Sequence, residues 1–173
     1  MAAEAGLDCI EWIYDEFGCA ANPLNTDEGV EKIRDLSATH NVVVQSICAD
    51  YFMDFPLVRV SDAEREARVQ KLIWLMERCG RLGVRRIVLP FVDASAIQDQ
   101  EEMRGAVGVL QEISDVAEFH RVEIHLEASL SPDQFRGFLG FLPGHVFKVN
   151  YDSGNSASLG YAPGDEFEAY GER

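Results

Sequence analysis

The sequence is poor in basic residues. It has 15 Lys and Arg residues against 30 Asp and Glu residues, which gives a formal net charge of −15 at pH 7. Such a surface repels phosphate backbones and anionic membranes, so we expect neither nucleic-acid binding nor membrane docking. No apolar run approaches the roughly 18 residues of a membrane span. The N-terminus shows no basic segment followed by an apolar one, so no signal peptide is visible. These absences predict a cytoplasmic protein.

Several common motifs are also missing. The four cysteines (Cys9, Cys19, Cys48 and Cys79) include no C-x-x-C pair, so we expect reduced core residues rather than a disulfide framework. No glycine-rich phosphate loop follows a strand-like run, which disfavours a nucleotide-binding open sheet. No Ser-His-Asp order or nucleophile elbow is present, which disfavours a serine hydrolase.

What the chain does contain is a regular alternation of strand-like and helix-like segments. The predicted strands are Leu7–Ile13, Val42–Cys48, Arg86–Phe91, Val122–Leu126 and Phe147–Tyr151. The predicted helices are Asp27–Thr39, Asp62–Cys79, Gln98–His120 and Pro132–Leu142. Ser61 and Glu64 form a capping box before the second helix, and Ser131 precedes Pro132 at the start of the fourth. This β-α-β-α order predicts an α/β fold with a parallel sheet.

The last two predicted strands favour a closed (β/α)8 barrel of the TIM type over an open sheet. Polar residues occupy alternate positions in both strands; they are Glu123, His125 and Glu127 in one, and Lys148, Asn150 and Asp152 in the other. Alternate residues share one face of a strand. The polar faces should therefore line a barrel interior, while the apolar faces lie under the helices.

The spacing of these polar residues is the same in both strands. If the strands are neighbours and lie level, Lys148 faces Glu123 and Asn150 faces His125. Glu127 and Asp152 then emerge together at the C-terminal rim, where barrels of this kind place their active sites. Two carboxylates there repel each other, and a divalent cation would relieve the repulsion. The alternative is that one carboxylate caps the next helix while the other is solvated.

Three segments carry a resemblance to a known family. Gly6–Trp12 (GLDCIEW), Val122–Ser129 (VEIHLEAS) and Val149–Asn155 (VNYDSGN) resemble the xylose isomerase-like barrel superfamily, in its sugar phosphate isomerase/epimerase branch. The resemblance covers essentially the whole chain. The segments are short, and their order and spacing carry more weight than any one of them.

The resemblance implies roles for particular residues. Glu127 and Asp152 match the family's metal-binding Glu and Asp, at the ends of the fifth and sixth barrel strands. Glu11 matches a Glu that lines the substrate pocket. Asn155 occupies a position where many members carry a substrate-contacting His, and an amide cannot carry the same proton.

Other residues are candidates for the same pocket. Asp50 lies in an aromatic loop after a predicted strand, and we expect it to face the substrate. His125 points inward below the rim, where we expect hydrogen bonding rather than metal ligation. For a substrate phosphate, Arg59 and the Ser153-Gly154-Asn155 turn are the candidates, and neither is specific.

Compared with a complete barrel, which has eight strands in about 250 residues, the chain matches strands two to six. We therefore expect residues 1–173 to form one barrel domain truncated at both ends. The resemblance implies a further metal His on the seventh strand and a second metal Glu on the eighth. Unpaired strand edges favour association, so a homo-oligomer is possible.

The function predicted from the resemblance is a metal-dependent isomerase or epimerase of a small sugar or sugar phosphate. Glu127 would act in proton transfer through a metal-stabilised enediolate. Mixed carboxylate and histidine ligands favour Mn²⁺, Mg²⁺ or Co²⁺ over Zn²⁺. The alternatives are a catalytically inactive barrel fragment, a dehydratase or isomerase of a cyclic polyol, and a zinc-dependent apurinic endonuclease-like hydrolase. The last needs more histidines and a basic surface.

Overall fold

The sheet of the molecule has five parallel strands in sequential order. The computed structural model describes the backbone of residues 1–173 and every side chain except that of Cys19. The strands are β1 (Cys9–Ile13), β2 (Val43–Cys48), β3 (Arg86–Phe91), β4 (Glu123–Ala128) and β5 (Phe147–Val149). Their spatial order is β1-β2-β3-β4-β5, and each neighbouring pair is parallel. The predicted parallel α/β architecture is confirmed, and sequential order is what an arc of a barrel requires.

Helices connect the strands. The α-helices are α1 (Glu16–Cys19), α2 (Asp27–His40), α3 (Tyr51–Asp54), α4 (Asp62–Leu82), α5 (Gln100–His120), α6 (Pro132–Gly140), α7 (Ser153–Leu159) and α8 (Pro163–Tyr170). Short 3-10 turns lie at Ala3–Ala5, Pro23–Asn25 and Asp93–Ser95. The capping box of Ser61 and Glu64 forms as predicted, and Pro132 begins α6. The sequence did not predict α1, α3, α7 and α8. None of the helices among the described residues is long and apolar enough to cross a bilayer.

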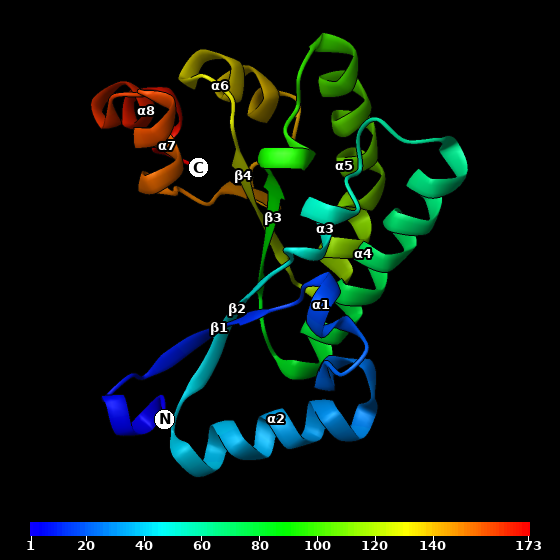
Figure 1. The fold of residues 1–173 in the computed structure, drawn as a ribbon, viewed down its shortest axis with the longest axis vertical. Coiled ribbons are helices and arrows are strands. Elements are labelled where there is room, and N and C mark those ends of the chain that lie inside the picture. Colours follow the sequence, from blue (N-terminus) through cyan, green and yellow to red (C-terminus); the bar gives the residue numbers. More distant parts are fainter.

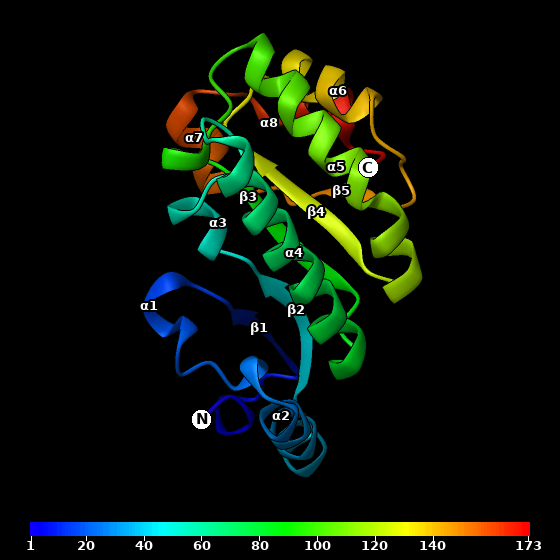
Figure 2. The same cartoon turned by 90° about the vertical axis from the view of Figure 1, so that its right-hand side faces the viewer.

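The two faces of the sheet have different surroundings. Helices α4 and α5 lie against one face (Figure 1) and stand in front of the strands in the perpendicular view (Figure 2). Residues facing these helices are fully buried; they include Ile87, Leu89, Ile124 and Leu126. On the opposite face Cys9, Glu11 and Ile13 are exposed. The helix-covered face therefore holds the core, and the other face is open at β1 and partly open at β4.

The two ends of the sheet are its edge strands. The strand β1 pairs with β2 alone and β5 pairs with β4 alone, within the part of the chain that the structure describes. A bulge between Ile10 and Glu11 interrupts the β1 ladder. The expectation that Cys9 is a core residue is wrong: its strand position points to the open face, so it is exposed. Cys48 is half-buried, Cys79 is buried, and Cys19 lies outside the described side chains.

Candidate active site

The carboxylate of Glu127 lies at the centre of the candidate site, near the C-terminal end of β4. It is half-buried, and two side-chain amides hold it. Asn150 donates from Nδ2 to Oε2 at 2.7 Å, and Asn155 donates from Nδ2 to Oε1. Asn150 follows β5, and Asn155 lies in the first turn of α7. The two amides fix the orientation of the carboxylate and leave its remaining lone pairs for another ligand.

The register between β4 and β5 differs from the predicted one. Leu126 pairs with Val149 and His125 pairs with Lys148, so Asn150 rather than Asp152 lies level with Glu127. The prediction that Lys148 faces Glu123 and Asn150 faces His125 is therefore wrong by two residues. Strands of a barrel are tilted and staggered relative to one another. Residues at equal positions within two strands therefore do not lie at equal height in the sheet.

Asp152 is the N-cap of α7. Its Oδ1 accepts from the backbone N–H groups of Gly154 at 2.7 Å and Asn155 at 2.9 Å. Capping by one carboxylate is the alternative to metal binding that the sequence left open, and the structure shows it. The side chain is nevertheless exposed, and both bonds use the same oxygen. The second oxygen, Oδ2, is thus accessible to a ligand.

Neighbouring charges act on Glu127. Burial raises the pKa of its carboxyl above the ordinary value, and the negative charges of Asp152 and Asp50 raise the pKa further. The amide donors Asn150 and Asn155 act in the opposite direction. Among the ion pairs of the described residues, none joins Glu127, Asp152 or Asp50 to a Lys, Arg or His. These three carboxylates therefore have no direct ion-pair partner in the described part of the chain.

Asp50 follows β2 and Glu11 lies on β1, and β3 separates both of these strands from β4. The thiol of Cys48, at the end of β2, donates to Oδ1 of Asp50 at 3.0 Å. Burial and the adjacent carboxylate raise the pKa of this thiol, which therefore stays protonated. Glu11 is exposed on β1 and accepts a hydrogen bond from the Ser46 hydroxyl. Sequence reasoning missed Ser46, which becomes visible only when the β1–β2 register is known.

His125 lies below the rim on β4. Its Nε2 is 3.0 Å from Oε2 of Glu123, two residues earlier on the same face of the strand. It does not contact Glu127 through a described hydrogen bond, so the prediction of a role below the rim stays a prediction.

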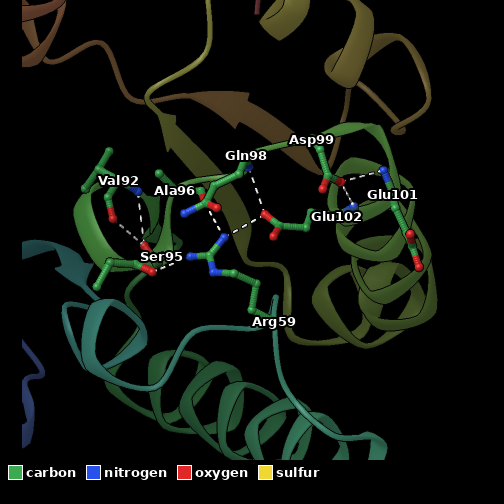
Figure 3. A network of polar contacts seen from close by, with 9 residues as sticks. Arg59, Val92, Ser95, Ala96, Gln98, Asp99, Glu101 and Glu102 are labelled. Carbon is green, nitrogen blue, oxygen red and sulfur yellow. Dashed lines mark hydrogen bonds and ion pairs between the residues drawn. The ribbon is translucent and has the colours of Figure 1, made fainter.

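The guanidinium of Arg59 is engaged in contacts within the chain. Its guanidinium forms an ion pair with Glu102 at 2.6 Å and donates to the carbonyl oxygens of Ala94 and Ala96 (Figure 3). Glu102 also accepts from the backbone N–H of Gln98 at 2.8 Å. These contacts fasten the loop after α3 to the start of α5. The other phosphate candidate, the Ser153-Gly154-Asn155 turn, is likewise engaged, because the backbone N–H groups of Gly154 and Asn155 donate to Asp152.

The donor set fits part of a divalent-metal site. Carboxylate oxygens of Glu127 and Asp152 are ligands that Mg²⁺ and Mn²⁺ accept, and neither carboxylate has an ion-pair partner among the described residues. Among the described residues, no group of three His, Cys, Asp or Glu side chains converges closely enough to hold a metal ion. The chain thus supplies two candidate ligands, not a complete set.

A family comparison agrees with this architecture. The model of the family described as xylose isomerase-like TIM barrel matches residues 1–173. The chain belongs to this family. The resemblance inferred from the sequence is thereby confirmed, together with the barrel type of the fold. No curated protein matches the chain significantly.

Solved structures of low sequence identity share the fold. A xylose isomerase domain protein from Planctomyces limnophilus is 16% identical with a TM-score of 0.74, over 99% of this chain and 62% of that one. The IOLI protein with a bound zinc atom is 20% identical with a TM-score of 0.76, over 95% and 59%. A D-psicose 3-epimerase, solved in the presence of D-fructose, is 16% identical with a TM-score of 0.76, over 96% and 61%. The chain therefore spans about 60% of the length of these structures.

Proposed function

We propose that the chain supplies part of the active site of a metal-dependent isomerase or epimerase that acts on a small sugar or sugar phosphate. The observation that carries this proposal is the half-buried Glu127 carboxylate, which two amides orient and which forms no ion pair with a described residue. Sugar epimerases among the structurally similar proteins support the same reading, as do a zinc-bound and a magnesium-bound member.

In this proposal the residues of the chain have distinct tasks. Glu127 and Asp152 would hold Mn²⁺, Mg²⁺ or Co²⁺, which polarises a substrate carbonyl and stabilises the negative charge that develops on it. Glu127 would accept a proton from the carbon beside that carbonyl. Asn155, Asp50 and Glu11 would hydrogen-bond substrate hydroxyls, and His125 would support the pocket from below.

A second candidate function applies to the chain taken alone, namely a folded barrel fragment without catalytic activity. The observation that favours it is the absence of a complete group of three metal-ligating side chains among the described residues. By contrast, the net charge of −15 disfavours the endonuclease-like hydrolase, because a DNA-facing surface must be basic.

Metal-dependent melting tests the proposal. Millimolar Mn²⁺ should raise the Tm of the wild-type chain, since a ligand at about 100 times its Kd stabilises a protein by about 2.7 kcal/mol. Glu127→Gln should abolish the rise. Glu123→Gln, on the same face of β4 but bonded to His125, is the matched control and should retain it. An equal rise in Glu127→Gln and wild type would refute the proposed site.

Deuterium exchange separates the two candidates. An isomerase or epimerase incorporates deuterium from D₂O into a ketose at the carbon that loses its proton. A panel of free and phosphorylated ketoses with Mn²⁺ should show incorporation by wild type and none by Glu127→Gln. Mn²⁺ stabilisation without any incorporation would support the non-catalytic candidate for the chain alone.

A further inference from the structure

We propose that Glu166 is a positioning residue that holds segment 151–156 in the orientation in which Asn155 reaches Glu127. Glu166 lies in α8, outside the candidate site, and its side chain is only 1% exposed. The inference rests on the proposed function, because segment 151–156 also contains the candidate ligand Asp152. It adds a residue that neither the sequence patterns nor the family resemblance singles out.

Three hydroxyl groups meet at the Glu166 carboxylate. Ser156 donates from Oγ to Oε1 at 2.7 Å, the Tyr170 hydroxyl donates to the same oxygen at 2.8 Å, and the Tyr151 hydroxyl donates to Oε2 at 3.1 Å. Ser156 and Tyr170 are themselves buried. In the described part of the chain the carboxylate has these three hydroxyls as its partners. A buried carboxylate is costly without donors, and these three bonds offset that cost.

Two of the three donors bracket the site segment. Tyr151 directly precedes Asp152, and Ser156 directly follows Asn155. The hydrogen bonds to Glu166 therefore fasten both ends of the segment to α8. The third donor, Tyr170, ends α8 itself and does not belong to the segment.

The segment leaves the sheet directly after β5, so the strand ladder holds only its beginning. There the N–H of Asn150 donates to the carbonyl oxygen of Leu126 at 2.9 Å. The ring contact between Tyr151 and Phe167 of α8 is apolar and does not fix the direction of the Asn155 amide. Hydrogen bonds from two fixed points to one carboxylate do so.

A matched pair of substitutions tests this role. Ser156→Ala and Tyr170→Phe each remove one hydroxyl from the same oxygen of Glu166, but only Ser156 belongs to the segment. The measurement is hydrogen exchange by NMR of the backbone N–H groups of Gly154 and Asn155, with the Tm recorded for each variant. Ser156→Ala should speed exchange of these two groups by about tenfold, while Tyr170→Phe should change it by less than about threefold, beyond any change in global stability.

The direction of the Ser156→Ala effect is informative. Alanine is the better helix former, so helix propensity alone predicts slower exchange in α7. Faster exchange therefore reports the lost attachment. Tyr151→Phe, at the other end of the segment, should act in the same direction. Equal acceleration in Tyr170→Phe and Ser156→Ala, or no acceleration in either segment variant, would overturn the proposal and leave Glu166 a stabilising group only.

Mn²⁺ binding links the two proposals without merging them. If the segment positions the metal ligands, Ser156→Ala should raise the Kd for Mn²⁺ severalfold relative to Tyr170→Phe. Failure of the wild-type chain to bind Mn²⁺ would count against the proposed function. The exchange comparison would still decide whether Glu166 positions the segment.

Discussion

The two faces of the sheet come from the same strands but have opposite chemistry. On β4, Ile124 and Leu126 are 0% exposed beneath the helices, while Glu123, His125 and Glu127 on the other face remain partly open. One face is apolar and close-packed, so its contribution to folding scales with buried area. The other face is polar and holds charges with few partners. Stability should therefore depend on the first face and ligand binding on the second.

The largest effect is expected on the helix-covered face. Leu126→Ala removes a fully buried side chain and leaves a cavity, which should lower the free energy of unfolding by about 2–5 kcal/mol. His125→Ala, the next residue along the strand but on the open face, is the control and should cost about 1 kcal/mol or less. Urea denaturation of both variants measures the difference. Similar losses for the two would show that the faces do not divide stability in this way.

A smaller effect is expected at Asp152, whose side chain caps α7 and is also a candidate metal ligand. Asp152→Ala removes the cap and should lower stability by about 1 kcal/mol. Asp152→Asn keeps an oxygen that can accept the same bonds, so its metal-free stability should stay close to wild type. Both variants should lose the Mn²⁺-dependent rise in Tm. Retention of that rise in Asp152→Asn would show that the residue is a helix cap only.

Elements that depend on local signals could be predicted from the sequence, and features that depend on the whole sheet could not. Buried runs such as Arg86–Phe91 and the capping signals of α4 and α6 are local, so these elements were predicted close to their observed bounds. The β4–β5 register was not, because strand stagger depends on the geometry of the whole sheet. The short helices α7 and α8 were missed for a related reason. They contain few periodic apolar residues, and the buried polar cluster around Glu166 forms only when they pack together.

A still smaller effect is expected in the pH dependence of stability, through Glu127 on the open face. The pKa of Glu127 is raised in the folded chain relative to the ordinary value of 4.5, so the folded state binds its proton more tightly than the unfolded state does. The stability of the metal-free protein should therefore fall as pH rises from about 4.5 through the folded pKa. Glu127→Gln should lack this component, so its Tm relative to wild type should increase with pH. A constant difference across that range would contradict the raised pKa.

The smallest effect, and one of opposite sign, is expected behind the helix-covered face at Asp27. Arg78 and Arg81 of α4 lower the pKa of this α2 carboxyl below its ordinary value of 3.8. Its stabilising contribution is therefore present above that value and is lost as pH falls through the lower folded pKa. Asp27→Asn should remove a small part of the stability near neutral pH, and salt should reduce the difference, because the side chain is 67% exposed.

The control for Asp27→Asn is Asp62→Asn, which also removes an acid from the first turn of a helix but breaks only a pair within α4. Melting curves between acidic and neutral pH, at low and high salt, compare the two variants. Asp27→Asn should lose more stability than Asp62→Asn at low salt and neutral pH, because the ion pairs of Asp27 with Arg78 and Arg81 link α2 to α4. In the same scan, the Tm of Glu127→Gln should rise relative to wild type as pH increases, whereas the Tm of Asp27→Asn should fall relative to wild type. The two carboxylates would then have opposed pH responses: the charge of Asp27 stabilises the fold, and the charge of Glu127 destabilises the metal-free fold.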